Sequence, residues 1–154
     1  MLRDIGFYLQ RALKFFRESY LFIVTLLTDY GKQNGKKTTL HIGYNGHSGG
    51  PKKDWLYFFI SELTGRKPLV SWYKPSLIIC SSFGSYWLLK IILGIYKVPS
   101  IFFTEENLTT LKKYREYKTY LDSQPSLAMG FDYCGTGNYR RFPLWLMYLF
   151  TPDI

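Results

Sequence analysis

The chain has 154 residues, a length typical of one domain, and 47% of them are hydrophobic while 20% are charged. This balance excludes an intrinsically disordered chain, and no run reaches the roughly 18 apolar residues that a membrane-spanning helix needs. The formal net charge is +9, but no recognisable nucleic-acid motif organises the basic residues, so we expect no nucleic-acid partner. A solvated basic surface is the plainest interpretation, and a membrane-facing patch is the second.

Residues 1–30 are predicted to form a basic amphipathic helix. Apolar residues recur at three- or four-residue spacing from Ile5 to Phe16, and basic residues are interleaved with them from Arg3 to Arg17. Such a helix either lies on an anionic membrane surface or packs against the domain, and the sequence supports both interpretations.

Residues 38–150 are predicted to form one Rossmann-like α/β domain. Strands and helices alternate there, which implies a mostly parallel sheet with helices on both faces. We expect strands at Thr38–Tyr44, Leu69–Trp72, Ser76–Ser81, Ser100–Thr104 and Leu127–Phe131, and helices at Lys53–Leu63, Ser85–Tyr96 and Leu108–Leu121.

Two cysteines occur in this chain, Cys80 and Cys134. Their number and spacing give neither a disulfide framework nor a zinc site. Cys80 lies within an apolar strand-like run and is predicted to be a small buried hydrophobe.

Ligands of open parallel sheets gather beyond the carboxyl ends of the strands. This rule selects four segments, which are Asn45–Gly50, Ser82–Gly84, Glu105–Asn107 and Asp132–Tyr133. The loop Asn45–Pro51 joins a strand to a helix, as phosphate-binding loops do, but carries no known phosphate-binding sequence. It therefore supports a nucleotide-binding module only weakly, and an acceptor-cleft loop with His47 as a sugar contact fits better. His41, on the strand, is predicted to be structural, and neither histidine has partners at metal-ligand spacing.

Three short segments follow one another in the second half of the chain. They read T-E-E-N at Thr104–Asn107, G-F-D at Gly130–Asp132 and Y-R-R-F-P-L at Tyr139–Leu144. In this order they resemble the acceptor-side half of the glycosyltransferase family 10 enzymes, the α-1,3/4-fucosyltransferases. That family has a strand ending in T-x-E-N, a later strand ending in G-F-D and a Y-x-R-x-P-L segment. The close resemblance covers about a third of the chain.

The resemblance implies transfer of fucose from GDP-fucose to a GlcNAc-type hydroxyl in glycan or lipopolysaccharide synthesis, with inversion at the anomeric carbon. Glu106 would be the general base, while Asn107, Asp132, Tyr139 and Arg141 would shape the acceptor cleft. Glu105 departs from the family, where glycine is common, and an adjacent carboxylate would raise the pKa of its neighbour. No cofactor is firmly implied beyond the donor substrate GDP-fucose, and a divalent metal is compatible with the chemistry.

Members of this family have two Rossmann-like halves in a GT-B arrangement, and the C-terminal half mainly holds the donor. The sequence contains no counterpart of the donor motif, so we expect an acceptor half whose donor domain is missing or separate, with little activity alone. Eukaryotic relatives carry a membrane-spanning stem, whose absence favours a bacterial-type cytoplasmic protein, peripheral to the inner face of the membrane. The alternative function is a non-catalytic domain that binds carbohydrate or a membrane surface.

Overall fold

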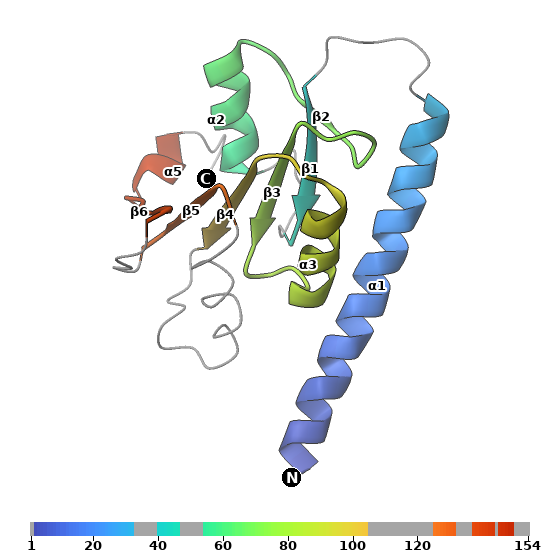
Figure 1. Ribbon diagram of the computed structural model, residues 1–154. Coiled ribbons are helices and arrows are strands. Elements are labelled where there is room, and N and C mark those ends of the chain that lie inside the picture. The colour runs from blue at the N-terminus through green and yellow to red at the C-terminus, as the bar shows by residue number, and fades with distance from the viewer. Residues whose placement is uncertain are drawn as a thin grey trace.

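The computed structural model describes residues 2–32, 40–46, 54–104, 125–131, 137–143 and 145–149. Within these residues a six-stranded sheet has helices on both faces, preceded by a long N-terminal helix (Figure 1). The helices are α1 (Leu2–Lys32), α2 (Trp55–Thr64), α3 (Tyr86–Ile95) and α5 (Trp145–Leu149), and the strands are β1 (His41–Asn45), β2 (Leu69–Val70), β3 (Leu77–Ser81), β4 (Ser100–Thr104), β5 (Leu127–Gly130) and β6 (Tyr139–Arg141). The predicted α/β fold is confirmed.

All strand pairs are parallel, in the order β2-β1-β3-β4-β5-β6. Apolar residues fill the central strands because both sheet faces are covered. On β3, Ile78 packs on the face of α3, and the next residue, Ile79, packs on the opposite face with α2. Phe102 and Phe103 divide between the same two faces on β4. This period of two lets a continuous apolar run supply two cores.

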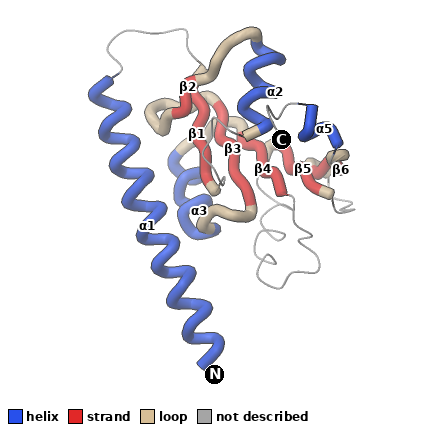
Figure 2. The backbone as a smooth tube through the Cα atoms, turned by 180° about the vertical axis from the view of Figure 1, so that it is seen from behind, coloured by secondary structure: helices blue, strands red, loops and turns tan. Residues whose placement is uncertain are grey.

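Side chains that cap the backbone fix the two central helices. Asp54 accepts a hydrogen bond from the Leu56 amide at 2.8 Å at the start of α2, and Gly65 ends the helix with φ of 62°. At the start of α3, the Ser85 hydroxyl accepts from the Leu88 amide. Figure 2 shows α2 and α5 on one side of the sheet and α3 with α1 on the other.

The helix α1 packs on the outside of the α3 layer. Phe22 meets Trp72 edge to face with ring centroids 5.1 Å apart, and Phe15 meets Trp87 at 6.0 Å. Asp29 accepts a hydrogen bond from the Trp72 amide at 3.1 Å. No helix among the described residues combines the length and apolarity needed to cross a bilayer.

Two predicted structural residues are in the expected places. His41 is buried, with its Nδ1 3.0 Å from the Tyr73 carbonyl oxygen. Cys80 is fully buried, and its thiol donates to the Ile101 carbonyl. The predicted helix Leu108–Leu121 lies outside the described residues, whereas β6 and α5 had not been predicted.

Candidate functional site

The carboxyl ends of all six strands lie at one edge of the sheet, because every pair is parallel. From β1, the chain adds β2 on one side of the sheet, and it then adds β3, β4, β5 and β6 in turn on the other side. The topological switch point is therefore between β1 and β3, where ligands of such sheets commonly bind. At this point Asn45 pairs with Cys80 in the register of the two strands.

The loops after β1 and β3 are in direct contact. Gly46 has φ of +84°, and a Cβ at this position would lie 2.1 Å from the Gly84 amide nitrogen. The Ser81 hydroxyl donates to the Gly46 carbonyl and also accepts from the Phe83 amide at 3.2 Å. Two of the four segments selected from the sequence, Asn45–Gly50 and Ser82–Gly84, thus meet at Gly46 and Gly84. Glycine is required here because both the left-handed conformation and the close backbone approach exclude a side chain.

Asn45 places an amide group beside these loops. The side chain is 5% exposed, and its Nδ2 has no hydrogen-bond partner among the described residues. A Cβ on Gly84 would meet the Asn45 amide atoms at 2.8–2.9 Å, so this amide packs directly against the loop after β3. A buried donor is costly without a partner, so this amide is a candidate contact for a ligand or a water molecule at the switch point.

A hydroxyl pair connects the β3 end to the β4 end. The Ser82 and Thr104 hydroxyl oxygens are 3.0 Å apart, and both residues are buried. Thr104 is the last residue of β4 and the first of the T-E-E-N segment. The loops after β1 and β3 therefore lie on the same edge of the sheet as the start of T-E-E-N. We call T-E-E-N, G-F-D and Y-R-R-F-P-L the family-like segments.

The three family-like segments meet on adjacent strands. Thr104 pairs with Gly130, and Gly130 pairs with Arg141. A Cβ on Gly130 would lie 2.6 Å from the Tyr139 hydroxyl oxygen and 3.0 Å from Thr104 Cγ2. The glycine of G-F-D thus leaves room for the tyrosine of Y-x-R-x-P-L, beside the threonine of T-x-E-N.

The segment after β6 is held on the opposite face from α3. The Phe142 amide donates to the Gly130 carbonyl at 2.8 Å, which extends the strand pairing. The Phe142 ring lies 4.6 Å from the Trp55 ring and 5.8 Å from the Phe103 ring, centroid to centroid. Arg141, the residue before Phe142, has an exposed side chain.

The helix α1 covers the switch-point end of this edge. The Glu18 carboxylate accepts a hydrogen bond from the Ser85 amide at 2.7 Å, at the N-terminus of α3. Burial raises the pKa of Glu18, although the Ser85 hydrogen bond and the charges of Lys14 and Arg17 act in the opposite direction. Lys14 donates to the Phe83 carbonyl and lies 4.0 Å from Glu18. A carboxylate of the chain thus caps the helix end that would attract an anion.

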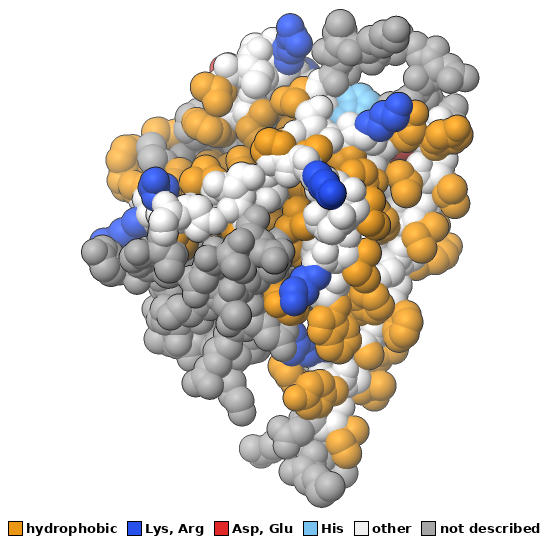
Figure 3. Space-filling model, in the orientation of Figure 1, with side chains coloured by type: hydrophobic (Ala, Val, Ile, Leu, Met, Phe, Trp, Pro, Cys, Tyr) orange, Lys and Arg blue, Asp and Glu red, His pale blue; other side chains and the backbone are white. Residues whose placement is uncertain are grey.

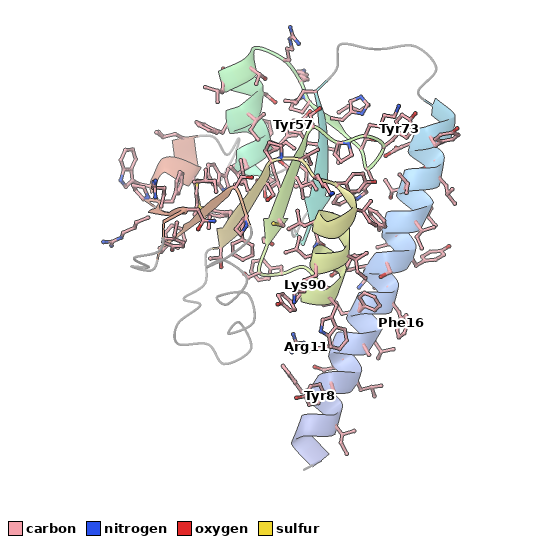
Figure 4. All side chains as sticks on the ribbon, in the orientation of Figure 1. Tyr8, Arg11, Phe16, Tyr57, Tyr73 and Lys90 are labelled. Carbon is pink, nitrogen blue, oxygen red and sulfur yellow. The ribbon has the colours of Figure 1, made fainter. Side chains whose placement is uncertain are left out.

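Two hollows lie between α1 and the sheet edge. One, of about 320 Å³, has Arg11, Lys14 and the segment Ser82–Trp87 on its walls. The other, of about 910 Å³, extends from Leu13 to Thr25 on α1 and reaches Asn45 and Gly46. In Figure 4, Arg11 points from α1 toward the start of α3, where its guanidinium lies 5.6 Å from the Trp87 ring.

The site residues predicted from the sequence divide into two groups. Tyr139 is 6% exposed on β6, and Arg141 is exposed at the end of that strand. Glu106, Asn107, Asp132 and His47 lie outside the described residues. Sequence reasoning missed Glu18 and Lys14 at this edge. The only signal for Glu18 was a single acid within the basic stretch of α1.

No cluster of three metal-ligating side chains occurs within the described parts of the chain. No protein-family model, no curated protein sequence and no solved structure matches this chain.

Proposed function

We propose that this chain is the acceptor-binding half of an inverting α-1,3-fucosyltransferase-like enzyme, acting on a GlcNAc-type hydroxyl in glycan or lipopolysaccharide synthesis. The observation that carries the proposal is the contact among Thr104, Gly130 and Tyr139. These residues come from the three segments that resemble the family. Thr104 and Gly130 are the last residues of β4 and β5, and the Tyr139 hydroxyl reaches Gly130 from the first residue of β6. Ligands of parallel sheets commonly bind at the carboxyl edge, where β4 and β5 end.

The proposed chemistry is a direct displacement at the anomeric carbon of GDP-fucose. Glu106 takes the proton from the acceptor hydroxyl as its oxygen forms the bond to fucose C1. The bond from C1 to the diphosphate oxygen breaks, and GDP leaves with the electron pair. The transition state resembles an oxocarbenium ion, so a carboxylate nearby both accepts the proton and offsets positive charge.

The remaining predicted residues would position the acceptor. In the sequence, Asn107 follows the base, and Asp132 is two positions after Gly130, the last residue of β5. Arg141 would pair with an acid such as Asp132 or face the donor diphosphate. His47, after Gly46, would reach the acceptor from the neighbouring loop. In this proposal a second Rossmann-like half, in this or another chain, holds GDP-fucose, and a divalent metal is compatible with the diphosphate leaving group.

Ligand binding to the 154-residue chain tests the proposal. Saturation-transfer difference NMR should detect N-acetyllactosamine with a dissociation constant in the millimolar range, while maltose gives no signal. Titration calorimetry should find GDP-fucose binding no tighter than about millimolar, because the basic loops attract a diphosphate only diffusely. A micromolar dissociation constant for GDP-fucose would identify this domain as the donor half and overturn the proposal.

Two adjacent arginines provide a matched pair of variants. Arg141→Ala should weaken N-acetyllactosamine binding roughly tenfold, since it removes a charged hydrogen-bonding group from the edge. Arg140→Ala should change it less than about twofold, because the Arg140 guanidinium bonds the Gly137 and Tyr139 carbonyls. Equal effects of the two substitutions would remove Arg141 from the acceptor site.

A further inference from the structure

The side of α1 that points away from the domain is strongly apolar. Five large side chains along it are between 53% and 67% exposed; they are Leu9, Phe16, Tyr20, Ile23 and Leu27, and we name them the outer face of α1. In Figure 3 a band of hydrophobic side chains follows α1 along the side of the molecule, and in Figure 4 Phe16 points away from the sheet. Exposed apolar surface of this extent marks an interaction site.

Two acids of the same helix face the domain. Glu18 and Asp29 are the only acids between residues 5 and 30. They accept hydrogen bonds from the Ser85 and Trp72 amides, respectively. Together with Phe15 and Phe22, which pack on Trp87 and Trp72, these bonds hold the helix in one rotation. In this rotation both negative charges are turned toward the domain and the outer face is turned away from it. The helix therefore has apolar residues on two sides, and only one of these sides is covered by its own core.

Positive charge near the outer face favours an anionic partner. Lys14 has 43% of its side-chain surface exposed, and Arg17 is also exposed. The whole chain carries a formal charge of +9. A second copy would bring the same positive charge against the helix, whereas an anionic lipid surface complements it. The helix is also too polar to cross a bilayer, so it would lie in the plane of the interface.

We infer that α1 anchors the protein to an anionic membrane surface, with its outer face in the headgroup region and the α/β domain on the water side. Phenylalanine, leucine and tyrosine on one side and basic residues at the flank are typical of helices that lie in a membrane interface. The hydrogen bonds of Glu18 and Asp29 would couple the orientation of the domain to that of the membrane. This inference does not depend on the proposed function.

Vesicle flotation with the full chain tests the inference. Wild type should bind vesicles of phosphatidylcholine that contain about 30% phosphatidylglycerol, and it should bind vesicles of phosphatidylcholine alone several-fold more weakly. A triple variant, Leu9→Gln, Phe16→Gln and Ile23→Gln, should bind the anionic vesicles at least about tenfold less, because it removes apolar area from the outer face without changing charge. Arg17→Gln should weaken the same binding about fivefold.

A second triple variant is the matched control. Leu63→Gln, Ile95→Gln and Leu149→Gln replace side chains that are 73%, 60% and 65% exposed on the other helices. This variant should bind vesicles as wild type does, and thermal melting should show that both triple variants fold. Equal binding by the two triple variants would overturn the inference. So would a wild-type dimer in light scattering that only the outer-face variant dissociates, together with no vesicle binding.

Discussion

Replacing Gly130 by alanine tests whether the three family-like segments are physically interlocked. The added methyl carbon would lie 2.6 Å from the Tyr139 hydroxyl oxygen, 3.0 Å from Thr104 Cγ2 and 3.2 Å from the Thr104 carbonyl oxygen. Tyr139 is 6% exposed and Thr104 2% exposed, so neither side chain can swing into water. Overpacking of this kind costs about 1–3 kcal/mol, and alanine recovers roughly 0.5–1 kcal/mol of backbone entropy. We expect a net loss of about 1–2 kcal/mol in the free energy of unfolding.

The partner substitution identifies the clash. Tyr139→Phe removes the oxygen that the new methyl group would meet, and alone it should cost less than about 1 kcal/mol, because phenylalanine fills nearly the same buried space. In the double variant the two losses should not add, and the coupling should be about 1 kcal/mol in favour of the pair. Urea denaturation of the four proteins measures this cycle. Strictly additive losses, or a Gly130→Ala protein as stable as wild type, would refute the packing argument.

Four further outcomes are expected. Gly46→Ala should prevent folding, judged by circular dichroism, because a methyl group would overlap the backbone of Gly84. Gly65→Ala is the control: this glycine has a similar φ but no atom within 4 Å of an added Cβ, so the variant should cost only about 1–2 kcal/mol of strain. Wild type should lose stability relative to Glu18→Gln as the pH rises from 4.5, the ordinary pKa of this carboxyl, through its raised folded-state pKa. The reason is that the folded state binds the Glu18 proton more tightly than the unfolded state does. A difference in melting temperature between the two proteins that does not vary with pH would contradict this. Burial raises the pKa of the Cys80 thiol, so in a Cys134→Ser background a thiol reagent should label it only after unfolding, and rapid native labelling would contradict its burial. In a two-domain enzyme that contains this half, Glu106→Gln should lower turnover about 100-fold or more with acceptor affinity within a few fold, and near-normal turnover would exclude Glu106 as the base.

The strand and helix pattern was readable from the sequence wherever periodicity and end signals agreed. The run Leu77–Ser81 is apolar on both sides, as a central parallel strand requires, and Asp54 and Ser85 precede helices that they cap. The strand β6 could not be predicted, because Tyr139–Arg141 is a three-residue edge strand with two exposed arginines. Its place depends on the long-range contact of Tyr139 with Gly130, which no local pattern contains.

The site was only partly predictable for a related reason. The rule for parallel sheets correctly brought Asn45 and Gly46 together with the segment Ser82–Gly84, because it needs only strand order and direction. The Ser82–Thr104 hydroxyl pair and the Glu18 cap depend instead on how separate elements pack. The periodicity of α1 likewise indicated an amphipathic helix without indicating its rotation. That rotation is set by Phe15 and Phe22 packing on Trp87 and Trp72.

The rotation of α1 also connects the two proposals. In Figures 1 and 2 the N-terminal half of α1 projects beyond the carboxyl ends of the strands. Four residues of that half line the hollow with Ser82–Trp87, on the domain side of the helix; they are Phe7, Gln10, Arg11 and Lys14. An α-helix with its side chains is roughly 10–12 Å across, so a membrane on the outer face of α1 would hold this end of the proposed acceptor edge close to the lipid surface. An acceptor sugar carried on a lipid would then reach the edge without leaving the membrane. The two proposals still fail separately, because vesicle binding reports on Phe16 and Ile23, whereas N-acetyllactosamine binding reports on Arg141.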